Sequence, residues 1–255
     1  MAFAGACMLI SCSGSKEQEP KTAEERFTIG KKYFDEGNYF DAIQQFDILK
    51  LQYQGSKVSD QGQYYTGMSH FKRGEYILAA FDFELLIKNY SSSTLIPDAY
   101  YMIAKSYVEQ SPQSQLDQSY TMRALDALQT FIELYPTHAR VADAQKDQKE
   151  LIEKLSKKEY DTGVLYEKME DTKAAMIYYD RVFDQYYNTA YADDALAAKI
   201  KLLLRKKRTE DARKSIEIFI KKFPESPYKS EIEKLKSALP AEQGGNSQSK
   251  TDSVN

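Results

Sequence analysis

The sequence predicts an all-α fold built from about five stacked pairs of antiparallel helices. The chain has 255 residues, 42% hydrophobic and 29% charged, which is enough apolar material for a large buried core. Its 11 Gly and 7 Pro are too few for the many turns of a β-sandwich or barrel. A spacing of Ala and large apolar residues that recurs along the chain is typical of one helix face. These three observations favour a helical repeat over a disordered or all-β chain.

Five segments carry the repeated spacing. In each, Ala is followed by a large residue at +4, another at +7 and an aromatic at +11, and offsets of 4, 3 and 4 lie on one helix face. The segments are Ala42/Phe46/Leu49/Tyr53, Ala79/Phe83/Leu86/Tyr90, Ala124/Leu128/Phe131/Tyr135, Ala175/Tyr179/Val182/Tyr186 and Ala212/Ile216/Phe219/Phe223.

Glycines precede three of these alanines by twelve residues, at Gly30, Gly67 and Gly163. In the first two cases a short turn sequence follows, Gly37-Asn38-Tyr39 and Gly74-Glu75-Tyr76. The arrangement resembles the tetratricopeptide repeat (TPR), whose period is ~34 residues and whose Gly lies where the first helix of the pair (helix A) crosses the second (helix B). The alternative is a helical bundle in which Ala and Tyr recur by accident.

The resemblance implies a TPR-like helical-hairpin solenoid of about five repeats with a concave face. The third and fifth repeats are degenerate, because Ala104 and Ile200 replace the early Gly and neither turn has one. The expected boundaries are a tether at 1–22, a solenoid at 23–239 with repeats at about 23–56, 60–93, 97–136, 156–188 and 193–226 plus a terminal helix, and a disordered tail at 240–255. A long loop is expected at 110–119.

The amino terminus predicts a lipid anchor. Residues 1–15 carry no charge and are followed by a polar stretch, and the apolar run is too short for the ~20 residues that span a bilayer. Leu9-Ile10-Ser11-Cys12 fits a bacterial lipobox, in which Cys12 is lipidated and becomes the mature N-terminus. No Lys or Arg precedes the run, which suggests a start upstream of Met1. The alternative is a Cys that falls there by chance.

From Cys12 to about Phe223 the chain resembles the BamD family of TPR lipoproteins, part of the machinery that folds β-barrels into the outer membrane. The residues that carry the resemblance are the lipobox followed by Ser-Gly-Ser-Lys-Glu, Tyr135-Pro136-Thr137, and the segment from Lys158 to Lys168. The resemblance implies an anchor in the bacterial outer membrane and a body that faces the periplasm. It also implies a BamA-like β-barrel protein with periplasmic repeats, unfolded outer-membrane proteins and other assembly lipoproteins as partners.

A peptide-binding groove is expected along the A helices, because TPR side chains near helix-A positions 2, 5, 9, 12 and 13 project into the concave face. Aromatic rings and ammonium groups suit an extended peptide that ends in an aromatic residue and a free carboxylate. The alternative is that these rings pack against the neighbouring repeat. The expected groove residues are Phe27, Lys31, Phe34, Tyr64, Met68, Phe71, Lys72, Tyr101 and Lys105.

Charge is unevenly distributed. Lys199 to Lys236 contains 13 basic and 6 acidic residues, whereas the net charge of the chain is −3. Lys206-Lys207-Arg208 is therefore a candidate patch for an acidic partner or anionic headgroups, or only a solvated face. The family resemblance implies that Arg181 contacts an acidic residue of the BamA-like partner; the alternative is a local pair with Asp184.

Enzymatic functions find little support in the sequence. The two histidines, His70 and His138, have no metal-like spacing, and no Gly-rich phosphate loop occurs, so no catalytic residue, metal or cofactor is predicted. The negative net charge argues against nucleic acid as a partner. Two other binding roles stay open: a periplasmic TPR scaffold for the cell wall or envelope, and a glycan-uptake lipoprotein, which the absence of Trp disfavours.

Overall fold

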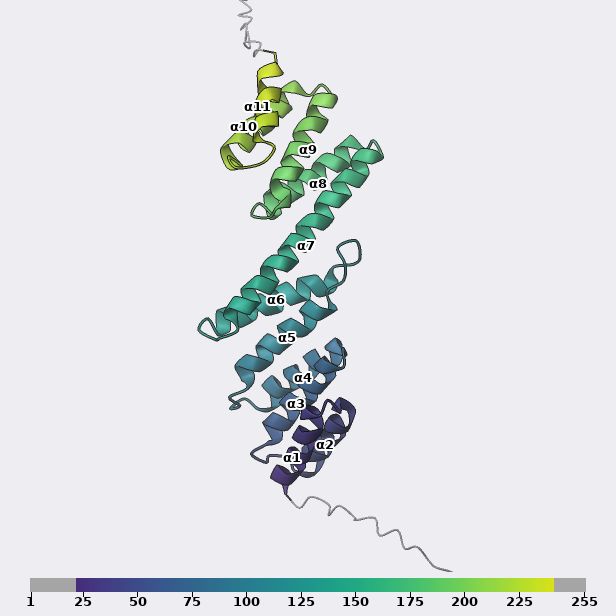
Figure 1. Cartoon of the computed structure of the whole chain (residues 1–255), viewed down its shortest axis with the longest axis vertical. Coiled ribbons are helices and arrows are strands. Elements are labelled where there is room, and N and C mark those ends of the chain that lie inside the picture. Colours follow the sequence, from purple (N-terminus) through teal and green to yellow (C-terminus); the bar gives the residue numbers. More distant parts are fainter. Residues whose placement is uncertain (1–21, 241–255) are drawn as a thin grey trace, which may run out of the picture. The chain divides into compact units, whose positions relative to one another are not determined.

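The structure, a computed structural model, describes residues 22–240, and this part of the chain consists of helices joined by short loops, without a β-strand (Figure 1). The predicted all-α, TPR-like fold is confirmed. Cys12 and nearly all of the predicted tail 240–255 lie outside the described residues. The helices are α1 (Ala23–Asp35), α2 (Tyr39–Gln52), α3 (Ser59–Lys72), α4 (Tyr76–Asn89), α5 (Ile96–Gln110), α6 (Ser119–Leu134), α7 (Val141–Lys168), α8 (Thr172–Gln185), α9 (Tyr191–Arg205), α10 (Thr209–Lys222) and α11 (Lys229–Ala238).

The repeated spacing forms the buried face of helix B in every hairpin. In all five sets the Ala and the two large residues that follow it are at most 1% exposed. The aromatic residue at +11 ends the helix, since it is the C-cap in each case, with φ between −124° and −131°. One spacing thus encodes both the packing face and the last turn. The five aromatic caps are Tyr53, Tyr90, Tyr135, Tyr186 and Phe223.

Glycine allows helix A to cross close over an aromatic ring of helix B. A Cβ atom at Gly30 would lie 2.6 Å from the Phe46 ring, which is closer than any carbon contact that packing tolerates. In the fifth repeat, where Ile200 replaces the glycine, the corresponding residue of helix B is the smaller Ile216, and both are fully buried in one cluster. The volumes on the two helices therefore compensate each other.

The turns between paired helices need a left-handed residue. Gly37 and Gly74 have φ values of 80° and 77° in the first two hairpins. Glu170 and Lys207 adopt φ values of 63° and 58° at the corresponding turns of the fourth and fifth hairpins, where no Gly is present. These two turns thus use the left-handed conformation without a Gly, whereas the third hairpin is joined by the longer loop 111–118.

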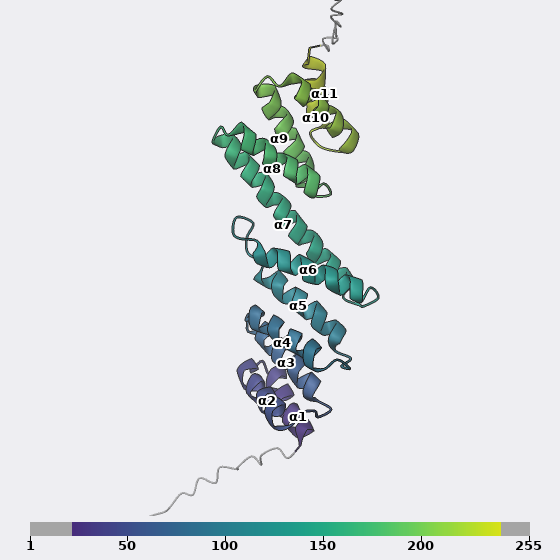
Figure 2. The same ribbon diagram turned by 180° about the vertical axis from the view of Figure 1, so that it is seen from behind.

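Two compact units divide between Glu109 and Gln110. Unit 1 contains α1 to α5 (Figures 1 and 2). The core of its first hairpin includes the fully buried Phe46 and Leu49. Unit 2 contains α6 to α11 and has two core clusters, one around Tyr179 and one around Phe219. No helix of the described residues is long and apolar enough to cross a bilayer.

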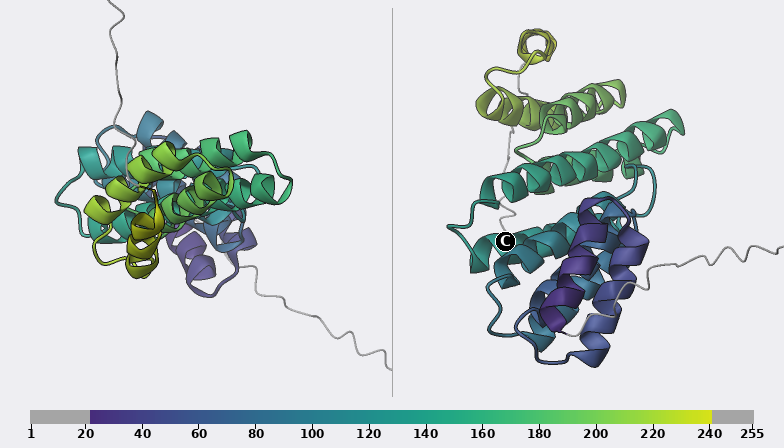
Figure 3. Two further views of the ribbon diagram at one scale, coloured as in Figure 1. Left: turned by 90° about the horizontal axis from the view of Figure 1, so that it is seen from above. Right: turned by 60° about the horizontal axis from the view of Figure 1, so that its bottom comes forward.

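Helix α7 is the longest helix in the described part of the chain, with 28 residues (Figure 3). Its first half, 141–155, precedes the boundary that the sequence suggests for the fourth repeat, so helix A of that repeat extends toward the N-terminus. The loop from 111 to 118 packs against it, since Lys154 Nζ donates to Ser111 Oγ at 2.8 Å and Lys158 Nζ to the Leu116 carbonyl at 2.8 Å.

Two serine clasps each tie the end of a hairpin back to its start, one in each unit. The Ser93 hydroxyl donates to Asp60 at 2.6 Å, and the Ser226 hydroxyl donates to Asp193 at 2.6 Å. In both, the serine follows helix B and the aspartate lies in the first turn of the preceding helix A, 33 residues earlier. A buried or half-buried hydroxyl that bonds a carboxylate fixes the loop against the helix start.

Candidate binding surfaces

The predicted groove residues of α1 lie in an aromatic cluster around Tyr65. The Phe27 and Phe34 rings lie 5.9 and 5.1 Å from the Tyr65 ring, and Phe27 also lies 5.9 Å from Phe46. These distances are typical of favourable ring pairs. The rings therefore pack partly between repeats, and their half-buried edges remain at the surface.

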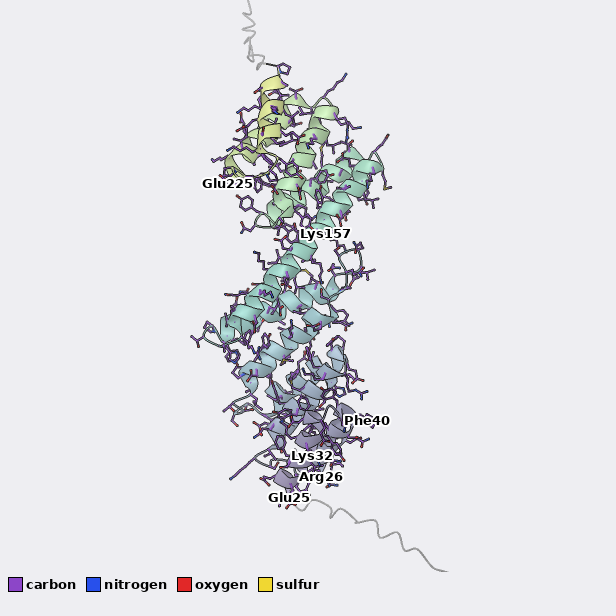
Figure 4. All side chains as sticks on the ribbon, viewed as in Figure 1. Glu25, Arg26, Lys32, Phe40, Lys157 and Glu225 are labelled. Carbon is purple, nitrogen blue, oxygen red and sulfur yellow. The ribbon has the colours of Figure 1, made fainter. Side chains whose placement is uncertain are left out.

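Lys31 lies over this cluster. Its Nζ atom is 5.1 Å from the centre of the Tyr65 ring and 2.6 Å from an Asp35 carboxylate oxygen. Phe27, Lys31 and Lys32 all line a hollow of about 470 Å³ along α1. Figure 4 labels Lys32 among the side chains of that helix. Tyr65 is a residue that the sequence analysis did not select, because it lies one position after a predicted groove residue and its central place depends on α1.

The α3 part of the predicted groove is only partly buried. Tyr64 packs on Phe83, with ring centres 5.5 Å apart, and Phe71 packs on Tyr76 at 5.3 Å. Met68 is half-buried. Lys72 is exposed, and within the described residues it forms no ion pair or hydrogen bond.

On α5 the predicted residues differ in access. Tyr101 is 8% exposed, so its ring offers little surface to a ligand. Lys105 is half-buried and pairs with Glu109 at 3.4 Å. The unit 1 surface therefore has its accessible rings and ammonium groups on α1 and α3 more than on α5.

A polar network fastens the hairpin of α3 and α4 behind this surface. His70 Nδ1 is 2.7 Å from Glu75, and His70 Nε2 is 3.6 Å from Asp82. The hydrogen bond from Arg73, followed by the one with His70, lowers the pKa of Glu75 to about 2, whereas burial raises the pKa of Asp82. Gln63 donates to Asp82 at 3.0 Å, so the buried carboxylate has a fixed partner.

This network does not resemble a metal site. No group of three or more His, Cys, Asp or Glu side chains that could hold a metal ion occurs within residues 22–240. His138, the other histidine, lies in unit 2 with its ring centre 5.4 Å from the Phe131 ring. Both histidines thus have structural neighbours in their own hairpins.

Arg181 in unit 2 pairs with Glu159 of α7, and not with the Asp184 that the sequence offered as a local alternative. The guanidinium Nη1 is 2.8 Å from the Glu159 carboxylate, and its carbon lies 4.8 Å from the centre of the Tyr178 ring. The Arg181 side chain is 39% exposed. Its planar head is therefore held in place and reachable from solvent, and an incoming carboxylate would share it with Glu159.

The predicted basic patch separates into two surfaces of unit 2. Lys206 lines a hollow of about 680 Å³ between α7 and α9, and Arg208 lines another of about 560 Å³ formed by α8, α9 and α10. Arg208 also pairs with Asp211 at 2.6 Å and donates to the sulfur of Met176 at 3.2 Å. Lys207, between them, has the left-handed turn conformation.

The five pairs of antiparallel helices in the described part of the chain define a TPR-like helical repeat protein. Residues 19–206 match the family described as YfiO, outer membrane lipoprotein, and the chain belongs to this family.

Two curated relatives share the printed name outer membrane protein assembly factor BamD. The relative from Caulobacter vibrioides is 26% identical over 224 residues, which cover 86% of this chain and 73% of the relative. The relative from Pasteurella multocida is 32% identical over 53 residues, 21% of this chain and 20% of the relative.

Solved structures with some likeness include the TPR2AB-domain:pHSP90 complex of yeast Sti1, at 10% identity and a TM-score of 0.39 over 84% of this chain and 97% of that chain. Another is a thermophilic TPR protein of Thermus thermophilus, at 13% identity and a TM-score of 0.36 over 85% of this chain and 97% of that chain.

Proposed function

We propose that the chain is an outer-membrane protein assembly factor. It is a scaffold that is lipid-anchored through Cys12, faces the periplasm, docks on a BamA-like β-barrel protein and recruits unfolded barrel precursors by their C-terminal segments. Membership of an outer membrane lipoprotein family supports the location, and the printed name of the curated relatives supports the role. The work of the molecule is binding, and it needs no cofactor.

The observation that carries the recruiting role is the surface of α1 and α3. The half-buried rings of Phe27 and Phe34 are held at inclined angles against Tyr65, so they give a ligand rigid aromatic contact area. Lys31 lines the adjacent hollow and Lys72 is exposed. An extended precursor whose last residue is aromatic fits both features, because the ring packs on rings and the terminal carboxylate pairs with an ammonium group.

Binding of a fluorescent barrel-derived C-terminal peptide tests this role. We expect Phe71→Ala with Lys72→Ala to weaken binding about tenfold, the effect of losing one aromatic contact and one ion pair of ~1.4 kcal/mol together. The matched control is Phe81→Ala with Lys88→Ala, because these are exposed residues of the same two types on α4. Unchanged affinity in the first variant, with its melting temperature preserved, removes this surface from the proposal.

The docking role is assigned to Arg181. Its guanidinium is held by Glu159 and Tyr178 in a fixed orientation, which favours bidentate binding of a partner carboxylate. Arg181→Glu should reduce co-purification of the BamA-like protein, and Glu159→Gln should increase it, since the guanidinium then has no competing carboxylate. Arg123→Glu, an exposed change on α6, is the control. Full recovery of the partner with Arg181→Glu would exclude the residue from the interface.

A further inference from the structure

The hollow of about 680 Å³ between α7 and α9 occupies, in unit 2, the helix-A face that the sequence analysis considered only in unit 1. Tyr160, Val164, Glu167 and Lys168 line it, at offsets of −3, +1, +4 and +5 from Gly163. In the first repeat, the predicted groove residues Phe27, Lys31 and Phe34 have the same first three offsets from Gly30. The helix-A positions that face the predicted groove in unit 1 therefore face this hollow in unit 2.

The lining has an apolar floor and an aromatic wall. Val164 and Ala198 supply the floor over the buried Leu202, and Tyr160 supplies the wall, with its ring centre 6.1 Å from that of the buried Tyr179. Tyr179 is 1% exposed, so it supports the Tyr160 ring from behind and its own position does not depend on a ligand. A preformed apolar concavity of this size accepts one or two side chains of a peptide.

The charges around the hollow favour an anion. Four basic side chains and two acidic ones line it. Arg205 is paired with Glu167 and Lys201 with Glu231. Lys168 and Lys206 therefore face Glu170 alone. Glu167 has two partners. The Tyr179 hydroxyl donates to it at 2.7 Å and Arg205 Nη2 donates to it at 2.7 Å. Among the described residues, Lys168 and Lys206 make no ion pair or hydrogen bond, so both ammonium groups remain available.

A wider field points to a partner with several acidic side chains. The stretch from Lys199 to Lys236, which supplies one wall of the hollow, has 13 basic and 6 acidic residues. Such a field attracts a segment rich in Asp and Glu more strongly than it attracts a single terminal carboxylate.

We propose that this hollow binds an extended internal segment of a partner protein in which Asp or Glu side chains flank an aromatic or large apolar residue. The apolar side chain enters the floor between α7 and α9, and the flanking carboxylates pair with Lys168 and Lys206. The site is distinct from the unit 1 surface, since all of its residues belong to unit 2.

Binding of two fluorescent peptides to the full chain tests the charge requirement. The first peptide contains Asp-Phe-Glu with blocked ends, and the second contains Asn-Phe-Gln with a free C-terminal carboxylate. Lys168→Gln with Lys206→Gln should weaken binding of the first peptide about fivefold, the effect of two rim ion pairs. Lys149→Gln with Lys234→Gln, two exposed lysines elsewhere in unit 2, is the matched control and should leave binding unchanged.

Photocrosslinking locates the bound peptide. A benzoylphenylalanine at Ala198 should crosslink the acidic peptide, and one at Phe71 should not. The proposal is overturned if the acidic peptide crosslinks only from Phe71, if it binds no better than the second peptide, or if the Lys168/Lys206 variant binds it as the wild type does. In each of these outcomes a barrel-derived C-terminal peptide still reports separately on the unit 1 surface, through Phe71→Ala with Lys72→Ala.

Discussion

A methyl group at Gly163 would collide with the Tyr179 ring, and this collision allows a quantitative test of how the hairpins are built. The added Cβ atom would lie 2.7 and 2.8 Å from two carbons of that ring. Tyr179 is 1% exposed and its hydroxyl is bonded to Glu167, so the ring has no free space into which it can rotate. Gly163→Ala must therefore displace the ring or separate α7 from α8.

Three contributions decide the size of the effect. Replacing Gly by Ala inside a helix favours folding by ~1 kcal/mol. Overpacking of a dense core costs ~2 kcal/mol. Displacement of the phenol weakens a hydrogen bond to a carboxylate, which is worth ~1.5–3 kcal/mol. The last two effects exceed the first, so we expect Gly163→Ala to lower the free energy of unfolding of unit 2 by about 3 kcal/mol.

Urea unfolding followed by circular dichroism measures this change, and a double-mutant cycle isolates its cause. Tyr179→Leu removes the ring and imitates the fifth repeat, where aliphatic residues occupy both positions. In that background Gly163→Ala should be neutral or stabilising, because only its helix propensity remains. If Gly163→Ala destabilises the Tyr179→Leu protein as much as the wild type, close contact between glycine and ring does not determine the crossing.

Three further predictions concern local interactions. The Arg73 guanidinium helps to hold the folded-state pKa of Glu75 near 2, compared with an ordinary value of 4.5. The ionised Glu75 therefore stabilises the fold above pH 4.5, and this stabilisation is lost as the pH falls toward 2. The melting temperature of Glu75→Gln should accordingly fall less over this range than that of the wild type. Ser93→Ala, which leaves Asp60 without its clasp, should lower the free energy of unfolding by ~1 kcal/mol in urea titrations, and an unchanged midpoint would contradict the clasp. Thr22→Ala, which removes the capping box of α1, should cost ~1 kcal/mol and increase hydrogen exchange in the first turn of that helix, whereas unaltered exchange would argue against the cap.

Local spacing was sufficient to predict the hairpins. The positions that the sequence analysis aligned, such as Ala175 and Val182, are the fully buried face of helix B, and the aromatic at +11 is the residue that ends the helix. A helix has a fixed period, so a pattern of large and small residues along one chain segment states which side is buried. The early glycines marked the crossings for the same reason, since only the neighbouring helix of the same hairpin is involved.

The binding surfaces were less predictable, because they depend on residues that are distant in sequence. Arg181 was selected for an interface, but its contact with Glu159 joins positions 22 residues apart on two helices. Tyr65 was not selected, although it lies at the centre of the ring cluster in unit 1. The burial of Tyr101 could also not be predicted from its position in helix A of the third repeat.

The sequence by itself determined that this chain is a row of helical hairpins with a basic C-terminal stretch, and it predicts a lipobox at Cys12, since each of these features is written within a few tens of consecutive residues. Only the tertiary structure decided which charges stay unpaired and where a hollow forms. Lys206 and Arg208 are two residues apart in the chain and yet line different hollows, because the turn between α9 and α10 sends them to opposite sides of the hairpin. Ion pairs between helices and the hollows that helices line both arise from the packing of several helices, which no single segment encodes.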